Sequence, residues 1–543
     1  FDEVTVGGVL SVSTGADNDA TAGAGSSKFI AYSLSAPEII LNRAGAQNKA
    51  DLDFYAGTLD VTAQNTLITA DNTINGTAPT SLTLPAAIGF GAYFGLVDIN
   101  NGKEFRVDNA DGEVHVGQMD IGSRGGRIQV ADSDNLLLDA LNARDTTLTL
   151  VAPTGYDGQK PLLKATSADL TDSVLLLDGD LDNFGVDTTI IESNSLSEPL
   201  DVRVDPYTSG LTLRYDLDWV IVGDDIVGNI YGISAHPVMK ALSEGQVASQ
   251  AFVNRGSDFV AGEGISSAVF AAADAGFSFF SAVSYGHERY ETGSHVDVGG
   301  VSILLGGAYG TDVSAGRLTV GAFFELGDGT YDSYNDLAGY GTVNGSGDTK
   351  YVGGGLLGRL DFAGSSTGHT YLEASGRVGR VSADFESADL PLTHRYDLSS
   401  TYYGFHVGVG RVFNISDSTT FDLYGKWLFT HQGGKDLSVA GVPVHFDDIS
   451  SHRLRAGFRI STEVNEWFKP YFGAAYEHEL DGKAEGTVRG FAIDVPELKG
   501  GSGIGEIGVS FAAADRLTVD LSVQGYVGQR QGVSGGLRLV YNF

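Results

Sequence analysis

The first part of the chain offers few residues that could act as a catalytic base. His115 is the only histidine before His236, and it lies in the alternating stretch 113–117 (EVHVG), which is typical of a β-strand. A serine nucleophile needs a base, usually histidine, and no Gly-Asp-Ser-Gly or Gly-x-Ser-x-Gly motif surrounds a suitable serine. We interpret His115 as a solvent-facing strand residue and predict no enzyme. A glycosidase whose catalytic groups are carboxylates alone is the alternative that the sequence leaves open.

The acidic stretch 178–187 (DGDLDNFGVD) superficially resembles a calcium-binding loop. Its ligands would be Asp178, Asp180 and Asp182, because Ca²⁺ prefers oxygen ligands at such alternate positions. However, no Gly follows the third ligand, and Thr189 occupies the position of the usual bidentate Glu. We expect a solvated turn, with calcium as the alternative, and predict no cofactor.

Composition excludes several classes of protein. The 543 residues suffice for two or three domains, and the formal charge of −35 argues against binding nucleic acid. Cysteine is absent, which excludes disulfides and Cys-based metal sites. No stretch approaches the roughly 18 to 20 apolar residues of a membrane helix, but a membrane barrel hides its signal by alternating apolar and polar residues. Because the sequence opens at Phe1 without a signal peptide, we expect a processed chain or a fragment.

Residues 1–205 contain short apolar runs, such as 4–12, 127–130 and 173–177, separated by Gly, Asn and Asp. No 3.6-residue periodicity is long enough for a helical domain. Short strands and frequent turns favour a right-handed β-helix or a related β-solenoid. A β-sandwich is the alternative, since the spacing is irregular and shows no strict repeat.

Residues 206–235 read as a last β-segment and connector, after which the pattern becomes helical. In 236–262 apolar and small residues recur at helical spacing. Such a helix would span roughly 35 to 40 Å, enough to cross a hydrocarbon core of about 30 Å. It is too polar to face lipid, so protein must surround it at membrane depth. The residues that we assign to it are Lys240, Leu242, Glu244, Phe252, Asn254, Arg255 and Asp258.

Residues 263–543 repeat a period of two. In 317–326, 453–460 and 517–524 one face is apolar and the other is polar, charged or glycine, which is typical of a transmembrane strand. About twelve such runs alternate with tight turns and longer loops. Alternation alone does not separate a soluble sandwich from a membrane barrel. Strand length and aromatics near strand ends, such as Tyr331, Tyr402 and Trp467, favour the membrane.

The C-terminus gives a further sign of a membrane barrel. Leu537, Leu539, Tyr541 and Phe543 fall on one face at period two, and the last residue is aromatic. This pattern looks like the signal by which the barrel-assembly machinery recognises outer-membrane barrels. An ordinary edge strand is the alternative.

Seven segments after residue 236 occur in an order that fits one family: 240–245 (KALSEG), 251–256 (AFVNRG), 292–297 (TGSHVD), 396–400 (YDLSS), 423–426 (LYGK), 476–478 (YEH) and 524–528 (QGYVG). Together they make 236–543 resemble the autotransporter translocator domain of type V secretion. The resemblance covers more than half of the chain and does not reach the preceding part. It implies a twelve-stranded barrel whose lumen holds one helix linked to a passenger outside.

The dimensions agree with that barrel. Twelve strands about 4.8 Å apart and tilted by about 40° close at a radius of about 12 Å, which leaves room for one helix about 10 Å across. Charged residues opposite the apolar face should then point into the lumen, where most would pair with one another and some would contact the helix. From phase alone these are Arg317, Glu325, Arg359, Asp361, Glu373, Arg377, Asp422, Lys426, Arg453, Arg455, Arg459, Glu477, Glu479, Glu506 and Arg538.

Some autotransporters sever the passenger inside the barrel by cyclisation of an asparagine, usually in an Asn-Asn pair on the helix. The corresponding stretch here, near residues 250–251, has no such pair, and Asn254 stands alone. We expect an uncleaved chain. If cleavage occurred, Asn254 would be the reacting residue, helped by lumen carboxylates.

The sequence thus predicts an all-β chain of four parts: a solenoid passenger (1–205), its end and connector (206–235), a helix (236–262) and a barrel (263–543). The predicted function is an autotransporter in the outer membrane of a Gram-negative bacterium, with an adhesive or scaffold-like passenger exposed at the cell surface. Expected partners are outer-membrane lipid and lipopolysaccharide, the barrel-assembly machinery and periplasmic chaperones, without nucleic acid, for a monomeric barrel. A porin-like channel with a surface domain and a surface enzyme with its active site outside this sequence are the alternatives.

Overall fold

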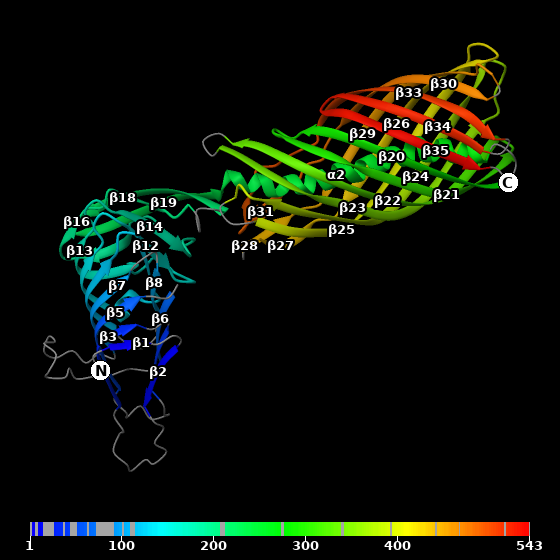
Figure 1. Cartoon of the computed structure of the whole chain (residues 1–543). Helices are drawn as coiled ribbons and strands as arrows, with labels where there is room; N and C mark the ends of the chain where they lie inside the picture. The colour runs from blue at the N-terminus through cyan, green and yellow to red at the C-terminus, as the bar shows by residue number, and fades with distance from the viewer. Residues whose placement is uncertain are drawn as a thin grey trace. The chain divides into compact units, whose positions relative to one another are not determined.

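The computed structural model describes residues 3–5, 9–14, 27–35, 38–43, 52–61, 65–71, 92–99, 103–108, 114–206, 212–272, 276–337, 341–390, 394–439, 442–465, 467–514 and 517–541. The chain forms two compact units, which divide between Ser234 and Ala235. Figure 1 shows the elements of each unit.

The N-terminal unit contains two sheets of mostly parallel strands, and the chain contributes one strand to each sheet in turn. The first sheet has the strand order β1-β3-β5-β7-β9-β11-β13-β15-β19-β18, with β16 beside β13. Its strands are β1 (Glu3–Thr5), β3 (Ser27–Ser35), β5 (Leu52–Val61), β7 (Ala92–Ile99), β9 (Val114–Ile121), β11 (Leu136–Asn142), β13 (Leu163–Asp169), β15 (Thr188–Ser193), β16 (Leu196–Ser197), β18 (Leu213–Val222) and β19 (Asp225–Ala235). The second, in the order β17-β14-β12-β10-β8-β6-β4-β2, contains β2 (Val9–Thr14), β4 (Glu38–Arg43), β6 (Asn65–Asp71), β8 (Lys103–Asp108), β10 (Gly126–Val130), β12 (Thr147–Ala152), β14 (Val174–Gly179) and β17 (Asp201–Val204).

This stacking confirms a solenoid, because neighbouring strands of successive turns run parallel. The β-sandwich alternative is wrong for the same reason, since its sheets are antiparallel. The right-handed β-helix form of the solenoid stays a prediction.

One position in successive turns of the solenoid carries aspartate or asparagine between apolar residues. Asp98, Asp120, Asn142 and Asp169 are register partners on β7, β9, β11 and β13. The Asp169 carboxylate accepts hydrogen bonds from the backbone N–H and the hydroxyl of Thr171, at 3.2 and 2.7 Å, and so stabilises the turn that follows the strand. The first three recur at intervals of 22 residues and the fourth follows after 27, so the regular repeat is short.

Apolar side chains from both sheets fill the space between them. Val116 and Leu138 from the first sheet and Leu177 from the second are buried in one cluster. The last strands reverse direction, since β19 runs antiparallel to β15, and Trp219 of β18 packs against the cluster. The two last strands therefore close this end of the apolar interior.

The C-terminal unit is built around a closed barrel of antiparallel strands (Figure 1), which confirms the predicted twelve-stranded barrel. In order around the barrel the strands are β20 (Gly276–Glu291), β21 (His295–Val313), β22 (Gly316–Leu337), β23 (Gly341–Phe362), β24 (Gly368–Ser387), β25 (His394–Asn414), β26 (Thr419–Gln432), β29 (Ile449–Thr462), β30 (Phe468–Glu479), β33 (Gly500–Ala514), β34 (Leu517–Gly528) and β35 (Arg530–Tyr541). β35 pairs with β20 and closes the barrel, with Leu539 opposite Ser281.

The two faces of the barrel differ as the alternation predicts. Outward positions hold exposed apolar side chains, among them Phe324, Val407 and Leu521. Inward positions hold buried charged side chains, such as Glu325 and Arg453. A continuous apolar outer surface is stable against lipid rather than water, so this distribution is that of a membrane barrel.

The barrel has two unlike ends. At the turn end, β21 passes to β22 through Ser314 and Ala315. At the loop end, the segments between β26 and β29 and between β30 and β33 form a small sheet of β27 (Lys435–Val439), β28 (Val442–Phe446), β31 (Gly486–Val488) and β32 (Phe491–Ala492). In outer-membrane barrels short turns face the periplasm and longer loops face the outside.

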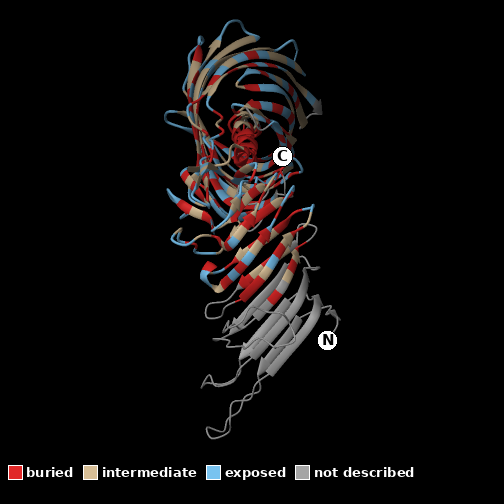
Figure 2. Cartoon of the chain, turned by 90° about the vertical axis from the view of Figure 1, so that its left-hand side faces the viewer, coloured by how far each residue is buried: buried red, intermediate tan, exposed pale blue. Residues whose placement is uncertain are grey.

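A helical run precedes the barrel strands and lies inside the barrel, where Figure 2 shows it as a buried element within the ring of strands. It comprises a 3₁₀ turn (Pro237–Met239), α2 (Lys240–Phe259), a π-helical turn (Val260–Gly264) and α3 (Ile265–Ala271). It runs past the predicted end at Gly262, and β20 begins only at Gly276, because α3 packs on an apolar surface of the lumen. Among the described residues, no helix is both long and apolar enough to cross a membrane.

Candidate functional site in the barrel lumen

The helical run enters the barrel at the loop end and finishes near the turn end. Near its start, Thr292 donates a hydrogen bond of 2.9 Å to Glu244. Just after its last residue, Arg317 donates to the carbonyl of Ala272. α2 is buried along almost its whole length although its sequence is polar. The barrel wall must therefore supply partners for its polar groups.

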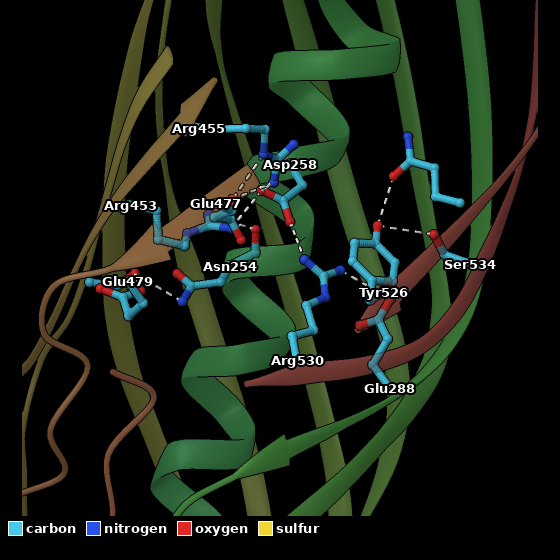
Figure 3. Close-up of polar contacts among 12 residues, drawn as sticks. Asn254, Asp258, Glu288, Arg453, Arg455, Glu477, Glu479, Tyr526, Arg530 and Ser534 are labelled. Atoms are coloured by element: carbon cyan, nitrogen blue, oxygen red, sulfur yellow. Dashed lines mark hydrogen bonds and ion pairs between the residues drawn. The ribbon is translucent and has the colours of Figure 1, made fainter. Parts of the chain in front are cut away.

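Asp258 of α2 contacts three arginines of the wall (Figure 3). Its Oδ1 accepts hydrogen bonds from Arg453 at 2.6 Å and Arg455 at 2.8 Å, and its Oδ2 accepts one from Arg530 at 2.7 Å. Arg453 and Arg455 come from β29 and Arg530 from β35, so one carboxylate bridges two separate parts of the wall. We call Asp258 and these three arginines the lumen lock.

Two wall carboxylates complete the charge balance of the lumen lock. Arg455 donates to Glu477 at 2.9 Å, and Arg530 lies 3.0 Å from Glu288. Three arginines thus face three carboxylates, all of them largely buried. Removing one partner of a buried ion network leaves an uncompensated charge and typically costs about 3 to 5 kcal/mol. The lumen lock therefore resists any movement of the helix that withdraws Asp258.

Asn254, one turn before Asp258, is tied to the wall by its side chain. Its Nδ2 donates to Ser451 at 3.0 Å, and Ser451 in turn donates to Glu479. Arg453 donates to the backbone carbonyl of Asn254 at 3.1 Å. Cyclisation would require Nδ2 to attack the carbonyl carbon of the same residue, whereas here the amide is directed at Ser451. The arrangement holds the helix rather than preparing that attack.

Another face of α2 fits closely against glycines of the wall. Gly300 and Gly329 lie opposite each other on β21 and β22, and a Cβ built on either would lie 3.0 Å from the ring of Phe252. The roles are reversed at Gly245 of the helix, where a Cβ would lie 2.6 Å from the hydroxyl of Tyr396. Glycine at these positions lets the helix and wall approach, which fixes the depth of the helix in the barrel.

The π-helical turn after α2 is held by a wall lysine. A π-turn interrupts the regular i to i−4 hydrogen bonding and often marks a functional position. Lys426 of β26 donates to the carbonyl of Ala261 within this turn at 2.7 Å, and it also pairs with Glu373 at 2.7 Å. The wall thus stabilises the interruption directly.

α3 rests on an apolar patch of the lumen that strict alternation does not predict. The patch consists of Phe280, Leu304, Phe323, Leu357 and Val540, which are buried and come from β20, β21, β22, β23 and β35. Each belongs to a pair of consecutive apolar residues whose other member is exposed on the outer face. These interruptions of the period of two are the sequence signal for the patch.

The structure places the sequence-predicted lumen residues on the inner face, where most pair with one another. Arg377 lies 3.2 Å from Glu325, and Arg459 donates to Glu506 at 2.8 Å. Other hydrogen bonds within the wall join Arg359 to Asp361, Tyr371 to Asp422, Arg455 to Glu477, and Ser451 to Glu479. Those that reach the helical run or Ala272 include Arg317, Lys426, Arg453, Arg455 and Arg538, the last at 3.9 Å from Glu263.

The sequence pattern does not single out Arg530, Glu288 or Ser451, although all three belong to the site. The C-terminal run is recognisable from Leu537 onward, and Arg530 lies near its start, beyond that recognisable stretch. Arg530 is an even number of residues before Arg538 on the same strand, so both side chains point to the same face. This relation to the predicted lumen residue Arg538 could have identified Arg530 from the sequence.

In the N-terminal unit the candidate residues serve as ion-pair and turn partners. His115 lies 2.9 Å from Asp139 and is buried, so the prediction of a solvent-facing histidine is wrong, because its ring turns toward that carboxylate. Arg127 donates to Asp178, and Asp180 accepts hydrogen bonds from the N–H groups of Gly155 and Asp182. Within the described ranges no group of three or more His, Cys, Asp or Glu residues could hold a metal ion.

The C-terminal signal residues lie partly within the described barrel. Leu537 and Leu539 are exposed on the outer face of β35. Tyr541 is the register partner of Phe279 on β20. Phe543 lies outside the described residues.

Replacing Asp258 by asparagine should loosen the helix, because the three arginines of the lumen lock would then face only two carboxylates. We expect a destabilisation of about 3 to 5 kcal/mol. The native chain has no cysteine, so Ser249→Cys, at a fully buried position of α2, reports exposure through its reaction with a maleimide. The expected result is much faster labelling of S249C in the D258N background than in the parent.

The matched control is Asp312→Asn, since Asp312 is largely exposed and pairs with Arg317 at the turn end. D312N should leave labelling of S249C unchanged. Equal labelling of the D258N and parent chains would contradict a locking role for Asp258.

The C-terminal part of the chain is similar to known proteins. Residues 292–524 match the family model described as "Autotransporter beta-domain". Similar solved structures include the transport unit of the autotransporter AIDA-I from Escherichia coli (18% identity, 49% of this chain and 90% of that chain, TM-score 0.41). Others are the translocator domain of NalP from Neisseria meningitidis (13%, 55% and 99%, 0.42) and the beta domain of Bordetella BrkA (16%, 50% and 100%, 0.39). No curated protein sequence matches the chain significantly.

Proposed function

We propose that the C-terminal barrel is an autotransporter β-domain, which the family match over residues 292–524 supports, and that the chain exports its own N-terminal unit and then anchors it at the cell surface. The barrel lies in the outer membrane of a Gram-negative bacterium, as such domains do. The passenger is then the solenoid that precedes Ala235.

The observation that carries this proposal is the course of the helix. Near its start, Glu244 accepts a hydrogen bond from Thr292 at the loop end of the barrel. Just after its last residue, the carbonyl of Ala272 accepts one from Arg317 at the turn end. Since the loop end of an outer-membrane barrel faces outside, the chain that precedes the helix leaves the barrel on that side. This is the direction that export of an N-terminal passenger requires.

The transport step itself is physical rather than catalytic. The barrel passes the passenger outward as an extended chain or a hairpin, and folding outside opposes return through the lumen. The closing strands β18 and β19 are the first complete hairpin of the solenoid to emerge, because they are nearest to the helix in sequence. We assign to them the nucleation of passenger folding.

For the passenger we propose an adhesive or scaffold-like role. Support comes from its parallel sheets, whose outer surface carries ion-pair ladders. Lys160 and Lys164, for example, both pair with Asp134, and hydrogen bonds from these lysines lower the pKa of Asp134 to about 2. Such repeated charges suit contacts spread over a surface.

The proposed partners follow from the barrel. Outer-membrane lipid and lipopolysaccharide contact its apolar outer face. The barrel-assembly machinery and periplasmic chaperones act during biogenesis, through the outward row that contains Leu537 and Leu539. The barrel is proposed to be monomeric, because closure between β20 and β35 leaves no unpaired strand edge in the ring.

We also propose that the chain stays in one piece, because the Asn254 amide donates to Ser451 rather than approaching its own carbonyl. Protein purified from outer membranes should give one intact mass, and Asn254→Ala should give the same result. Two fragments separated at Asn254 in the parent, and none in the variant, would contradict this proposal.

Removing the helix should open the barrel. The intact chain in planar bilayers is expected to show almost no conductance, since α2 and its wall partners occupy the lumen. A chain lacking residues 236–262 should conduct strongly. Large and stable conductance from the intact chain would contradict the proposal and favour a porin with a surface domain.

A further inference from the structure

One arginine interrupts the apolar outer face of the barrel near the turn end. Arg411 of β25 is exposed, at an outward position between Val409 and Phe413. Its register partners on the neighbouring strands are Thr370 of β24 and Leu423 of β26. In the turn-end halves of these three strands, as far as the structure describes them, no other outward position carries a charge.

The outer face around Arg411 is apolar. Leu372, Val409 and Leu423 are exposed there, so they contact lipid acyl chains in a membrane. A charged side chain on the lipid face destabilises a barrel, and it does so more strongly the deeper it lies. Arg411 therefore needs a partner of opposite charge at the membrane surface.

The guanidinium of Arg411 is directed toward the turn end. It lies 5.2 Å from the ring of Phe413, which is two residues nearer that end of β25. Long basic side chains commonly extend in this way along an apolar surface until the charge reaches the interface. Aromatic girdles of outer-membrane barrels lie at the same level. The charge is thus placed at the height of the lipid headgroups.

The protein satisfies only part of this guanidinium. Its Nη1 donates a hydrogen bond of 3.2 Å to the hydroxyl of Thr370, and in the described part of the barrel no carboxylate pairs with Arg411. Arginine carries five N–H donors in a planar fork that matches phosphate. The Thr370 oxygen accepts the bond from Arg411, so the hydroxyl hydrogen is also available as a donor. These donors suit one anion at the membrane surface.

We propose that Arg411 and Thr370 bind the phosphodiester group of an anionic phospholipid, whose acyl chains lie against Leu372, Val409 and Leu423. Phosphate is favoured over water by its charge and by its fit to the guanidinium fork. This inference rests on the proposed function, because there the barrel spans the outer membrane and its turn end meets the periplasmic leaflet. The contact holds the barrel at a fixed height in that leaflet.

A tryptophan beside the site reports which lipid occupies it. Phe421 of β26 is the register partner of Phe413, and the two rings lie 6.1 Å apart. Phe421→Trp is made in the whole chain after its three native tryptophans have been replaced by phenylalanine. This parent chain is reconstituted in phosphatidylcholine vesicles that contain an equal share of brominated phosphatidylcholine or brominated phosphatidylglycerol. The reporter lies near the turn end, so it senses the same site whichever way the barrel inserts.

We expect brominated phosphatidylglycerol to associate near the reporter about fivefold more strongly than brominated phosphatidylcholine, judged by quenching. Arg411→Gln should remove this preference. Arg411→Lys keeps the charge but lacks the fork, and it should retain only about half of the preference. The matched control is Arg380→Gln, since Arg380 of β24 is also exposed and donates to a hydroxyl of β25, that of Ser399, but in the loop-end half of the wall. R380Q should keep the full preference.

Equal quenching by the two lipids in the parent chain, or a preference that survives in R411Q, would overturn the proposal. A full preference in R411K would overturn it as well, since any positive charge would then suffice. An excess of inorganic phosphate in the buffer should leave the preference in place. Its loss would show that the site takes free phosphate, against the proposed lipid headgroup.

Thr370→Val gives a second test if R411Q does not insert into vesicles. This variant lacks the hydroxyl donor and should reduce the preference for phosphatidylglycerol, and an unreduced preference would contradict the proposed site. The quenching does not depend on the helix in the lumen, so its failure is distinct from a failure of the conductance test.

Discussion

The pairing of one helix carboxylate with three wall arginines is the interaction on which the closed barrel depends. A polar helix cannot lie at membrane depth unless protein supplies a partner for each of its buried polar groups. Asp258 meets that condition with Arg453, Arg455 and Arg530, whose remaining charge is balanced by Glu288 and Glu477. Because the three arginines come from β29 and β35, the same contact also fixes where the helix stands relative to the wall. The glycine contacts of Phe252 and the bond from Lys426 to Ala261 act on the same helix above and below it.

The barrel strands contact a different environment on each face, with lipid on the outside and a charged lumen on the inside. Period-two alternation satisfies both over most of the wall. It fails where α3 docks, because a short apolar helix needs an apolar surface, and there the inner face takes Phe280, Leu304 and Phe323 while the outer face stays apolar. The helix is therefore held by ion pairs in its middle and by apolar contacts at its end, which respond differently to salt and temperature.

Much of the barrel could be predicted from sequence, because strand alternation assigns each side chain to a face without any knowledge of its partner. Arg453 and Glu506 could be assigned to the inner face in this way. The pairing of Asp258 with Arg530 could not, since it depends on the register between a helix and a strand far away in the chain. The extension of the helix to Ala271 could not be predicted either, because α3 is stabilised by the apolar patch of the barrel wall rather than by its own sequence. In the solenoid, the position shared by Asp120 and Asn142 recurs at a constant interval over too few turns to stand out in the sequence.

The most direct test asks whether the helix occupies the lumen after the passenger has reached the surface. Asn254→Cys and Ser451→Cys place two thiols where the native side chains lie 3.0 Å apart, in a chain without other cysteines. The account predicts that these cysteines form a disulfide efficiently in cells, and that the cross-linked chains carry a passenger accessible to protease from outside. Efficient cross-linking only in chains whose passenger is still protected, or its absence from chains with an exposed passenger, would contradict a helix that closes the barrel after export.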